Sequence, residues 1–361
     1  MKEYRVNTAD ICHNVKIIQQ KCGQIIGVIK ANGYGIGLEN MATILSRAGI
    51  EQFAVTEVSD LHRLRAAGFR QPVLVLRSTC LAEEAAQILA ADGIATIGSE
   101  KSAQAYDVAA AQAGVRAKAH VKLDTGMSRY GFLPEDTATV VQVVQKLKNV
   151  DICGVYTHFS NAFGDAAGSA AQLERFTAAV ARLQAAGIST GVVHAANSAG
   201  IFNVAGACLD AVRPGSALLG RAAVSADCGF KRVGMLHSRV IELKTIRKGA
   251  GVGYLSAYRA KSERTLAIVP VGNADGFGVG SLSDVNDFPA LLRGLRMALR
   301  RFIKKEGLYV TIGGKRYPTV GHIGLNHTAV DVTGAQVAVG DEVQVDVNPL
   351  FVNPLIARVL E

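Results

Sequence analysis

The sequence predicts an α/β protein: an N-terminal (β/α)8 barrel of the TIM type, followed by a C-terminal domain made mostly of β-strands. Short apolar segments alternate with Ala- and Leu-rich helical segments between residues 25 and 213. The short segments are apolar on both faces, which is typical of parallel strands that crossover helices cover. Eight such units fit a closed barrel better than an open doubly wound sheet.

The elements follow one another in a regular order. A helical pattern formed by Ile11, Val15 and Ile18 precedes the first strand. The predicted strands are 25–29, 53–56, 73–76, 94–97, 117–123, 152–156, 191–194 and 209–213. Helical patterns between them cover residues 41–48, 82–91, 104–112, 137–147 and 170–186.

The alternation stops near residues 224–230, and the pattern changes to β-runs separated by Gly, Asn and Asp turns. These runs are 240–246, 266–271, 308–312, 328–332 and 342–347. The predicted domains are therefore residues 1–223 and 224–361. Segment 289–305 interrupts the second domain with a basic helical pattern. A solvated helix packed on that domain is favoured over membrane or nucleic-acid attachment, because one short helix is weak evidence for either.

Composition narrows the class of protein. The chain has 361 residues, a formal charge of +9 and no Trp, and its basic residues are mostly dispersed. This favours anionic small ligands over nucleic acid. Six cysteines lack the paired spacing of a zinc site or a disulfide framework, so reduced thiols in a cytoplasmic protein and no metal are expected. No apolar run approaches the roughly 18 residues of a membrane helix.

Polar residues follow the predicted strands at their C-terminal ends, where the loops of a barrel converge. Lys30 ends an apolar run and precedes a glycine-rich turn. Burial would disfavour its ammonium form, so its amine could act as a nucleophile or Schiff-base donor, although a plain turn with a solvated lysine fits equally well. The other residues so placed are Tyr34, Arg129, His158, Asn197, Ser198, Arg213, Gly215 and Ser216.

The loops after the seventh and eighth strands commonly bind phosphate in barrels. Here they offer Ser198, Gly215 and Ser216 as hydroxyl and backbone donors. A lysine after the first strand, opposite such a site, predicts pyridoxal phosphate as the cofactor. It would be held by an imine at one end and by its phosphate at the other.

Four segments together closely resemble the bacterial alanine racemases, which are barrel-type pyridoxal-phosphate enzymes. They are VIKANGYG at 28–35, KLDTGMSR at 122–129, HAANS at 194–198 and RPG at 213–215. The resemblance extends from the first residues to about Asp331. It implies a small amino-acid substrate and a head-to-tail homodimer whose active site takes residues from both subunits.

The resemblance also implies roles for individual residues. Lys30 is the cofactor lysine and one catalytic base, and Tyr254 of the partner subunit is the second base. Arg213 pairs with the pyridine nitrogen. The remaining cofactor contacts fall on Tyr34, His158, Asn197, Ser198, Gly215 and Ser216.

Substrate contacts are implied for Arg129, Leu325 and Asn326, and Arg129 can also hold the phenolic oxygen of the cofactor. Lys122, which is often carbamylated in the family, lies behind Arg129. His194 is expected as a hydrogen-bonded support behind the cofactor contacts.

Two bases suit racemisation, because a proton leaves one face of Cα and another arrives at the opposite face. A phenol ordinarily ionises near pH 10, so Tyr254 needs hydrogen bonds from His158 and Arg213 that favour the phenolate. An arginine at the ring nitrogen keeps that nitrogen unprotonated, because guanidinium does not give up its proton.

Departures from the family concern the substrate. Leu325 and Asn326 stand where the family usually has Met-Asp, Asn273 replaces an entryway tyrosine, and the C-terminal tail is short. Alanine is the default substrate, with serine, lysine, ornithine or a broad range of amino acids as alternatives.

A non-catalytic pyridoxal-phosphate-binding protein would share the barrel and Lys30, but such proteins usually lack the second domain that carries Tyr254. A related decarboxylase is disfavoured, because no cysteine-bearing C-terminal motif is present. Arg129 and Arg213, taken singly, also fit salt bridges at the protein rim.

Overall fold

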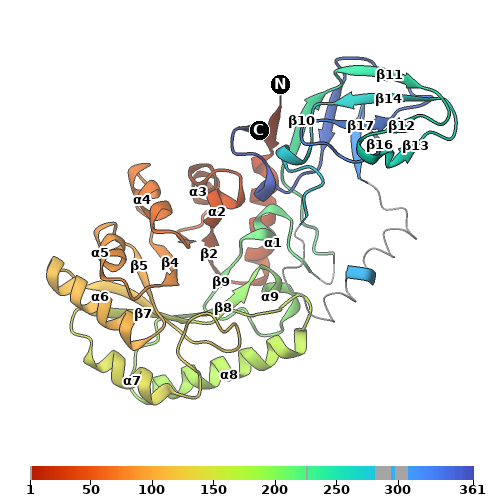
Figure 1. Cartoon of the computed structure of the whole chain (residues 1–361). Coiled ribbons are helices and arrows are strands. Elements are labelled where there is room, and N and C mark those ends of the chain that lie inside the picture. The colour runs from red at the N-terminus through yellow and green to blue at the C-terminus, as the bar shows by residue number, and fades with distance from the viewer. Residues whose placement is uncertain (1, 225–226, 281–293, 297–307) are drawn as a thin grey trace. The chain divides into compact units, whose positions relative to one another are not determined.

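The computed structural model describes residues 2–224, 227–280, 294–296 and 308–361. The chain forms two compact units. One is Thr8–Val233, and the other combines the residues up to Asn7 with Gly234–Glu361 (Figure 1).

The first unit is a closed parallel barrel, as the sequence predicts. Each strand pairs with the next in chain order, and β9 pairs with β2 to close the ring. Apolar residues on successive strands pack into one cluster inside the unit, including Ile26, Ala54 and Leu74. The strands are β2 (Gln24–Val28), β3 (Gln52–Val55), β4 (Val73–Ser78), β5 (Ile94–Ile97), β6 (Ala117–Lys122), β7 (Val150–Tyr156), β8 (Val192–Asn197) and β9 (Ala211–Arg213).

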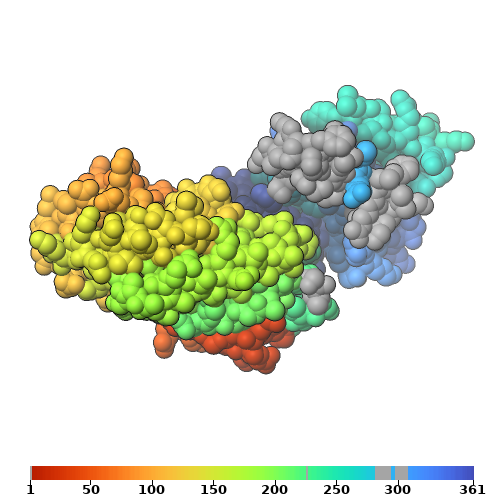
Figure 2. All heavy atoms as spheres, turned by 90° about the horizontal axis from the view of Figure 1, so that it is seen from below, coloured from red at the N-terminus to blue at the C-terminus, as the bar shows by residue number. Residues whose placement is uncertain are grey.

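Helices separate the barrel strands, and the longer ones bury apolar side chains in the core. In α4, Val58, Leu61 and Leu64 are buried at a spacing of three residues, as expected of an amphipathic helix. Helices α7 and α8 lie side by side on the surface of the unit, in yellow and light green (Figures 1 and 2). The helices are α1 (Thr8–Lys21), α2 (Lys30–Tyr34), α3 (Leu38–Arg47), α4 (Val58–Ala66), α5 (Ala82–Ala90), α6 (Glu100–Ala113), α7 (Thr137–Lys146), α8 (Ala166–Ala185) and α9 (Ser198–Asn203).

A disulfide joins Cys22, just after α1, to Cys208, just before β9. The expectation of reduced thiols is therefore wrong for this pair. The two residues are 186 positions apart in sequence, and their Cα atoms lie 5.4 Å apart in the fold, within the range of disulfides. Spacing along the chain carries no sign of such a pair, because barrel closure is what brings the two residues together.

The second unit is mostly β, as predicted. Its main sheet has the strand order β11-β14-β17-β16-β15-β18-β10-β1-β19. The strands are β1 (Glu3–Val6), β10 (Met235–Arg239), β11 (Glu242–Ile246), β14 (Arg264–Val269), β15 (Tyr309–Ile312), β16 (Lys315–Val320), β17 (Thr328–Asp331), β18 (Glu342–Val345) and β19 (Ala357–Leu360). A separate pair, β12 (Gly251–Val252) and β13 (Tyr258–Arg259), flanks the turn that carries Tyr254.

The first strand belongs to the second unit, so assigning residues 1–7 to the barrel domain was wrong. Strand β1 pairs antiparallel with β10 and parallel with β19. Tyr4 and Val6 are buried, and the Tyr4 hydroxyl donates to the carbonyl of Val347 at 3.0 Å. The strand has only four residues, and the strands that pair with it lie more than two hundred residues away in sequence. The local sequence pattern therefore does not indicate which unit it belongs to.

Segment 289–305, predicted as a basic helix, lies outside the described residues except at 294–296. None of the helices in the described part of the chain is long and apolar enough to cross a membrane.

Candidate active site

Lys30 begins α2 and is separated from the end of barrel strand β2 by one residue, Ile29. Its side chain is half-buried, and burial, followed by the charge of Arg129, lowers the pKa of its amine. The next residues adopt left-handed backbone angles: φ is 52° at Ala31, 53° at Asn32 and 52° at Tyr34. Such angles cost about 1–2 kcal/mol for each non-glycine residue. Strain of this kind clusters at functional sites.

Ser198, at the start of α9, organises the loop after β9. Its Oγ accepts the backbone N–H groups of Gly215 at 2.9 Å and Ala217 at 3.1 Å. Since a hydroxyl has one proton and two lone pairs, Ser198 retains its own proton to donate. A Cβ on Gly215 would lie 2.2 Å from the hydroxyl of Tyr34, so glycine is required for this close approach. Burial raises the pKa of Tyr34 to about 12 and keeps it a neutral donor.

Asn197 has a different contact from the one expected. Its side-chain oxygen accepts the N–H of Gly200 at 2.9 Å and caps α9. This contact explains an asparagine at the helix start without any ligand.

Arg213 is buried at the end of β9 and makes several hydrogen bonds inside the barrel unit. Its guanidinium donates to Nδ1 of His194 at 2.5 Å and to the carbonyls of Thr157 at 2.5 Å and Ala195 at 2.9 Å. A longer contact of 3.4 Å reaches Nδ1 of His158. Burial lowers the pKa of Arg213 to about 10, which still leaves it cationic at neutral pH.

The bond from Arg213 fixes the tautomer of two histidines. A guanidinium can only donate, so Nδ1 of His194 carries a lone pair and its Nε2 carries the proton. That proton is donated to Nδ1 of His120 at 2.9 Å, which makes His120 an Nε2–H tautomer as well. Burial and the charge of Arg213 lower the pKa of His194 well below its ordinary value and that of His120 to about 4. Both rings are therefore neutral supports of Arg213.

His158 is also neutral at physiological pH. Burial, and then the charges of Arg213, Arg129, Lys30 and Lys122, lower its pKa to about 3. The site in the barrel unit thus combines several cations with a neutral imidazole, an environment that suits an anionic ligand.

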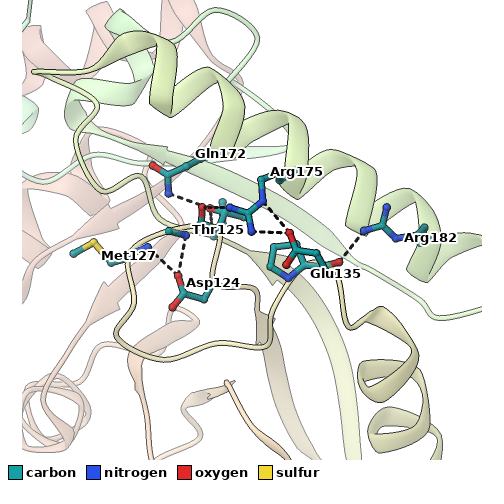
Figure 3. Close-up of polar contacts among 10 residues, drawn as sticks. Asp124, Thr125, Met127, Glu135, Gln172, Arg175 and Arg182 are labelled. Atoms are coloured by element: carbon teal, nitrogen blue, oxygen red, sulfur yellow. Dashed lines mark hydrogen bonds and ion pairs between the residues drawn. The ribbon is translucent and has the colours of Figure 1, made fainter.

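Arg129 lies on the loop that follows β6, and its guanidinium is 4.9 Å from the ring of Tyr130. Lys122, buried at the end of β6, donates to the carbonyl of Tyr130 at 2.6 Å, and burial lowers its pKa to about 8. Asp124 shapes this loop, because its Oδ1 accepts the backbone N–H groups of residues 126–128 at 2.8–3.0 Å (Figure 3). Lys122 therefore supports the start of the loop that presents Arg129.

Tyr254 lies in the second unit, on a short turn between β12 and β13. It is 76% exposed, and its neighbour Leu255 is 93% exposed with φ of 57°. A cavity of about 590 Å³ in this unit is lined by Tyr254, Leu325 and Asn326, together with apolar residues of β11, β14 and β16. The structure thus brings together the three predicted site residues of the second unit. Asn273 donates to the carbonyl of Phe277 at 2.8 Å within its own loop.

Sequence reasoning missed His120, Tyr156 and Gln172. Tyr156 stacks on His194 with ring centroids 5.0 Å apart, and its ring lies 5.0 Å from the guanidinium of Arg213. His120 stands two residues before Lys122 on the same strand. Side chains two residues apart on a strand point to the same face, so the position of Lys122 could have indicated His120. In the part of the chain that the structure describes, no group of three or more His, Cys, Asp or Glu side chains is placed to hold a metal ion.

Comparison with known proteins places the chain in a family. Residues 6–223 match the family "Alanine racemase, N-terminal domain", and residues 233–348 match "Alanine racemase, C-terminal domain". An alanine racemase of Desulfovibrio desulfuricans is 36% identical over 88% of this chain and 80% of its own length. One from Treponema pallidum is 34% identical over 94% of this chain and 87% of its own length.

Solved structures agree with these sequence relatives. An alanine racemase from Clostridium difficile 630 aligns over 100% of this chain and 95% of its own, with a TM-score of 0.83 and 25% identity. A similar fold occurs in the alanine racemase of Streptomyces lavendulae, with a TM-score of 0.84 and 22% identity. The chain therefore belongs to the alanine racemase family.

Proposed function

We propose that this chain is a pyridoxal-phosphate-dependent racemase that interconverts L- and D-alanine. The observation that carries the proposal is Lys30, a lysine of lowered pKa at the C-terminal end of a barrel strand. The same unit holds the hydroxyl and amide donors around Ser198 and the buried cation of Arg213. Two relatives named alanine racemase support this proposal, because their alignments with this chain cover 80% and 87% of their own length.

The residues present fit pyridoxal phosphate. The Ser198 hydroxyl, the Tyr34 hydroxyl and the Ser216 backbone would hold the phosphate, and a side chain at position 215 would fill this cradle. Lys30 would carry the cofactor aldehyde. When bound, the cofactor supplies an electron sink that acidifies the substrate Cα proton.

Lys30 would move the proton on one face of the substrate. Burial and the charge of Arg129 favour the neutral amine, which is the form that accepts a proton. Its Nζ would take the Cα proton from one enantiomer and return it to the same face in the reverse direction.

Arg213 would face the pyridine nitrogen as a permanent cation. Its hydrogen bonds to His194, Thr157 and Ala195 use the two terminal nitrogens of the guanidinium, which leaves Nε–H for a ligand. Because guanidinium keeps its protons, the ring nitrogen would receive a hydrogen bond without being protonated.

Tyr254 of the partner subunit would serve the opposite face in a homodimer. In support, Tyr254 and Leu255 form an exposed apolar tip, which is unfavourable unless another surface covers it. The neutral His158, whose Nδ1 faces the Arg213 donor, would offer its Nε2–H to the phenolic oxygen. Arg129 and Asn326 would orient the substrate carboxylate.

Two features of the second unit bear on the substrate side chain. Leu325 is 70% exposed, and the cavity beside Tyr254 is lined by Lys244, His322, Asn326 and His327 without a carboxylate. Alanine remains the proposed substrate, and serine, lysine, ornithine or a broad range are its alternatives. A cytoplasmic location is part of the same prediction.

The test is exchange of the Cα proton in deuterated water, followed by NMR and chiral analysis, with added pyridoxal phosphate and a panel of L-amino acids. Exchange with inversion that is fastest for alanine supports the proposal. Faster inversion of a larger or polar amino acid would replace alanine as the substrate. Binding of the cofactor without exchange for any amino acid would instead identify a cofactor-binding protein without racemase activity.

A further inference from the structure

Gln172, on α8, bridges the two loops that carry Arg129 and His158. Figure 3 shows its contact with Thr125 in the first of these loops. Its Nε2 donates to Oγ1 of Thr125 at 3.2 Å, four residues before Arg129. Its Oε1 accepts both the backbone N–H and the hydroxyl of Ser160 at 3.0 Å, two residues after His158. One side chain thus contacts both loops.

The orientation of this amide is fixed by its partners. The backbone N–H of Ser160 can only donate, so the atom that faces it must be the oxygen of Gln172, and the nitrogen must face Thr125. Thr125 then accepts from Gln172 and shares a hydrogen bond of 2.8 Å with Thr157. The carbonyl of Thr157 in turn accepts from Arg213.

Burial makes these hydrogen bonds consequential. Gln172 is 7% exposed, Thr125 is 1% exposed and Thr157 is fully buried. Water does not replace a lost partner at such sites, so a broken bond leaves a buried polar group unsatisfied. A Cβ on Gly126 would lie 3.3 Å from Nε2 of Gln172, which shows how closely the loop packs on this amide.

Arg175, one helical turn further along α8, holds the far end of the same loop. It donates to the carbonyl of Thr125 at 3.1 Å and to the carboxylate of Glu135 at 2.6 and 3.0 Å. Arg182 extends the contact by donating to the carbonyl of Pro134 at 2.7 Å (Figure 3). The exposed Arg175–Glu135 pair adds only modest stability, so we assign the main bridging role to the buried Gln172.

We propose that Gln172 is a positioning residue: its amide sets the Arg129 loop relative to the His158 loop and, through Thr125 and Thr157, relative to Arg213. The consequence for catalysis rests on the proposed function, whereas the effect on the loops does not.

Amide hydrogen exchange of the full chain without cofactor tests the effect on the loops. In Gln172→Met, we expect the amides of Ser160 and of residues 126–128 to exchange about tenfold faster, because both loops lose a buried partner. In Thr125→Val, only residues 126–128 should exchange faster, because the bond between Gln172 and Ser160 remains. Gln184→Met is the matched control. Gln184 is an exposed amide on the same helix that donates to Thr190 at 3.0 Å, away from both loops.

Kinetics give the second readout. In Gln172→Met loaded with pyridoxal phosphate, we expect kcat/KM for alanine to fall about tenfold, mainly through KM, because Arg129 would hold the substrate carboxylate less well. A merely structural role would lower Tm and leave KM unchanged.

Unchanged exchange at both loops in a folded Gln172→Met variant would overturn the proposal. If that variant does not fold, unchanged exchange at residues 126–128 in Thr125→Val overturns it. Faster loop exchange in a protein whose wild type does not racemise amino acids would keep the role of Gln172 and reject the proposed function instead.

Discussion

The site in the barrel unit and the turn that carries Tyr254 are built in opposite ways. In the barrel unit, Arg213 and His194 are buried, and their partners lie in the same unit. In the second unit, Tyr254 and Leu255 are exposed on a turn with left-handed backbone at Leu255. The first region is preorganised by its own chain, whereas the second is an exposed apolar tip that we expect a partner subunit to cover.

The largest expected effect concerns the barrel side of this comparison. Lys30→Ala should abolish Cα exchange, a loss of about 10⁴-fold or more, because one base and the cofactor attachment disappear together. Exchange in deuterated water and the visible absorbance of bound cofactor measure this loss. Lys118→Ala is the control, since Lys118 is an exposed lysine on barrel strand β6. Full activity of Lys30→Ala would remove the central residue of the proposal.

The next largest effect is expected if one active site combines Lys30 of one subunit with Tyr254 of the other. Tyr254→Phe should lower racemisation by about 10²- to 10⁴-fold while the cofactor absorbance remains. Mixing Tyr254→Phe with Lys30→Ala after dissociation should restore about a quarter of wild-type activity, because half of the dimers then contain one intact site.

One other result of the mixing experiment is informative. No recovery, with mixed dimers shown to form, would place Lys30 and Tyr254 of one chain in the same site. Tyr258→Phe, on the adjoining strand β13, is the control for a tyrosine of the same region and should retain activity.

A smaller effect is expected on stability against pH. His120 and His158 have pKa values lowered to about 4 and about 3, and burial lowers that of His194 as well. Below pH 6.5 the unfolded chain binds protons at these histidines, whereas the folded chain does not. Protons therefore favour the unfolded state, so the free energy of unfolding is highest above pH 6.5 and decreases as the pH falls below it. Between pH 7.5 and 5.5 the loss should be about 1 kcal/mol for each histidine.

Urea unfolding at the two pH values measures this loss, and NMR of the histidine rings identifies its source. The rings of His120 and His194 should show no titration above pH 5 and should both be Nε2–H tautomers. Titration of either ring near pH 6.5 in the folded protein would contradict the hydrogen-bond chain from Arg213.

The smallest effect is expected at Asn326, which lines the cavity beside Tyr254 in the second unit. Asn326→Asp restores the carboxylate that is usual in the family and removes an amide donor. We expect kcat/KM to fall more for serine than for alanine, with a change in their ratio of about tenfold at most. Competition between the two amino acids measures the ratio. An unchanged ratio would show that Asn326 contacts only the substrate carboxylate, which serine and alanine share.

The barrel could be predicted because its strands and helices have distinct periodicities and its strands follow the chain order. Once the barrel is assumed, the ends of its strands converge, so Lys30, Arg129 and Arg213 could be assigned to one region from their positions alone. The roles of Tyr34 and Tyr254 came from the resemblance to the alanine racemases, because a tyrosine in a glycine-rich loop has no distinctive pattern of its own.

Several features depend on contacts between residues far apart in sequence, and the sequence alone did not reveal them. The pairing of β1 with β10 and β19, the disulfide between Cys22 and Cys208, and the bridge by Gln172 are of this kind. A hydrogen bond or disulfide requires atoms to approach within a few ångströms. Local periodicity determines which residues form a strand or helix, but only the packed fold determines which side chains meet.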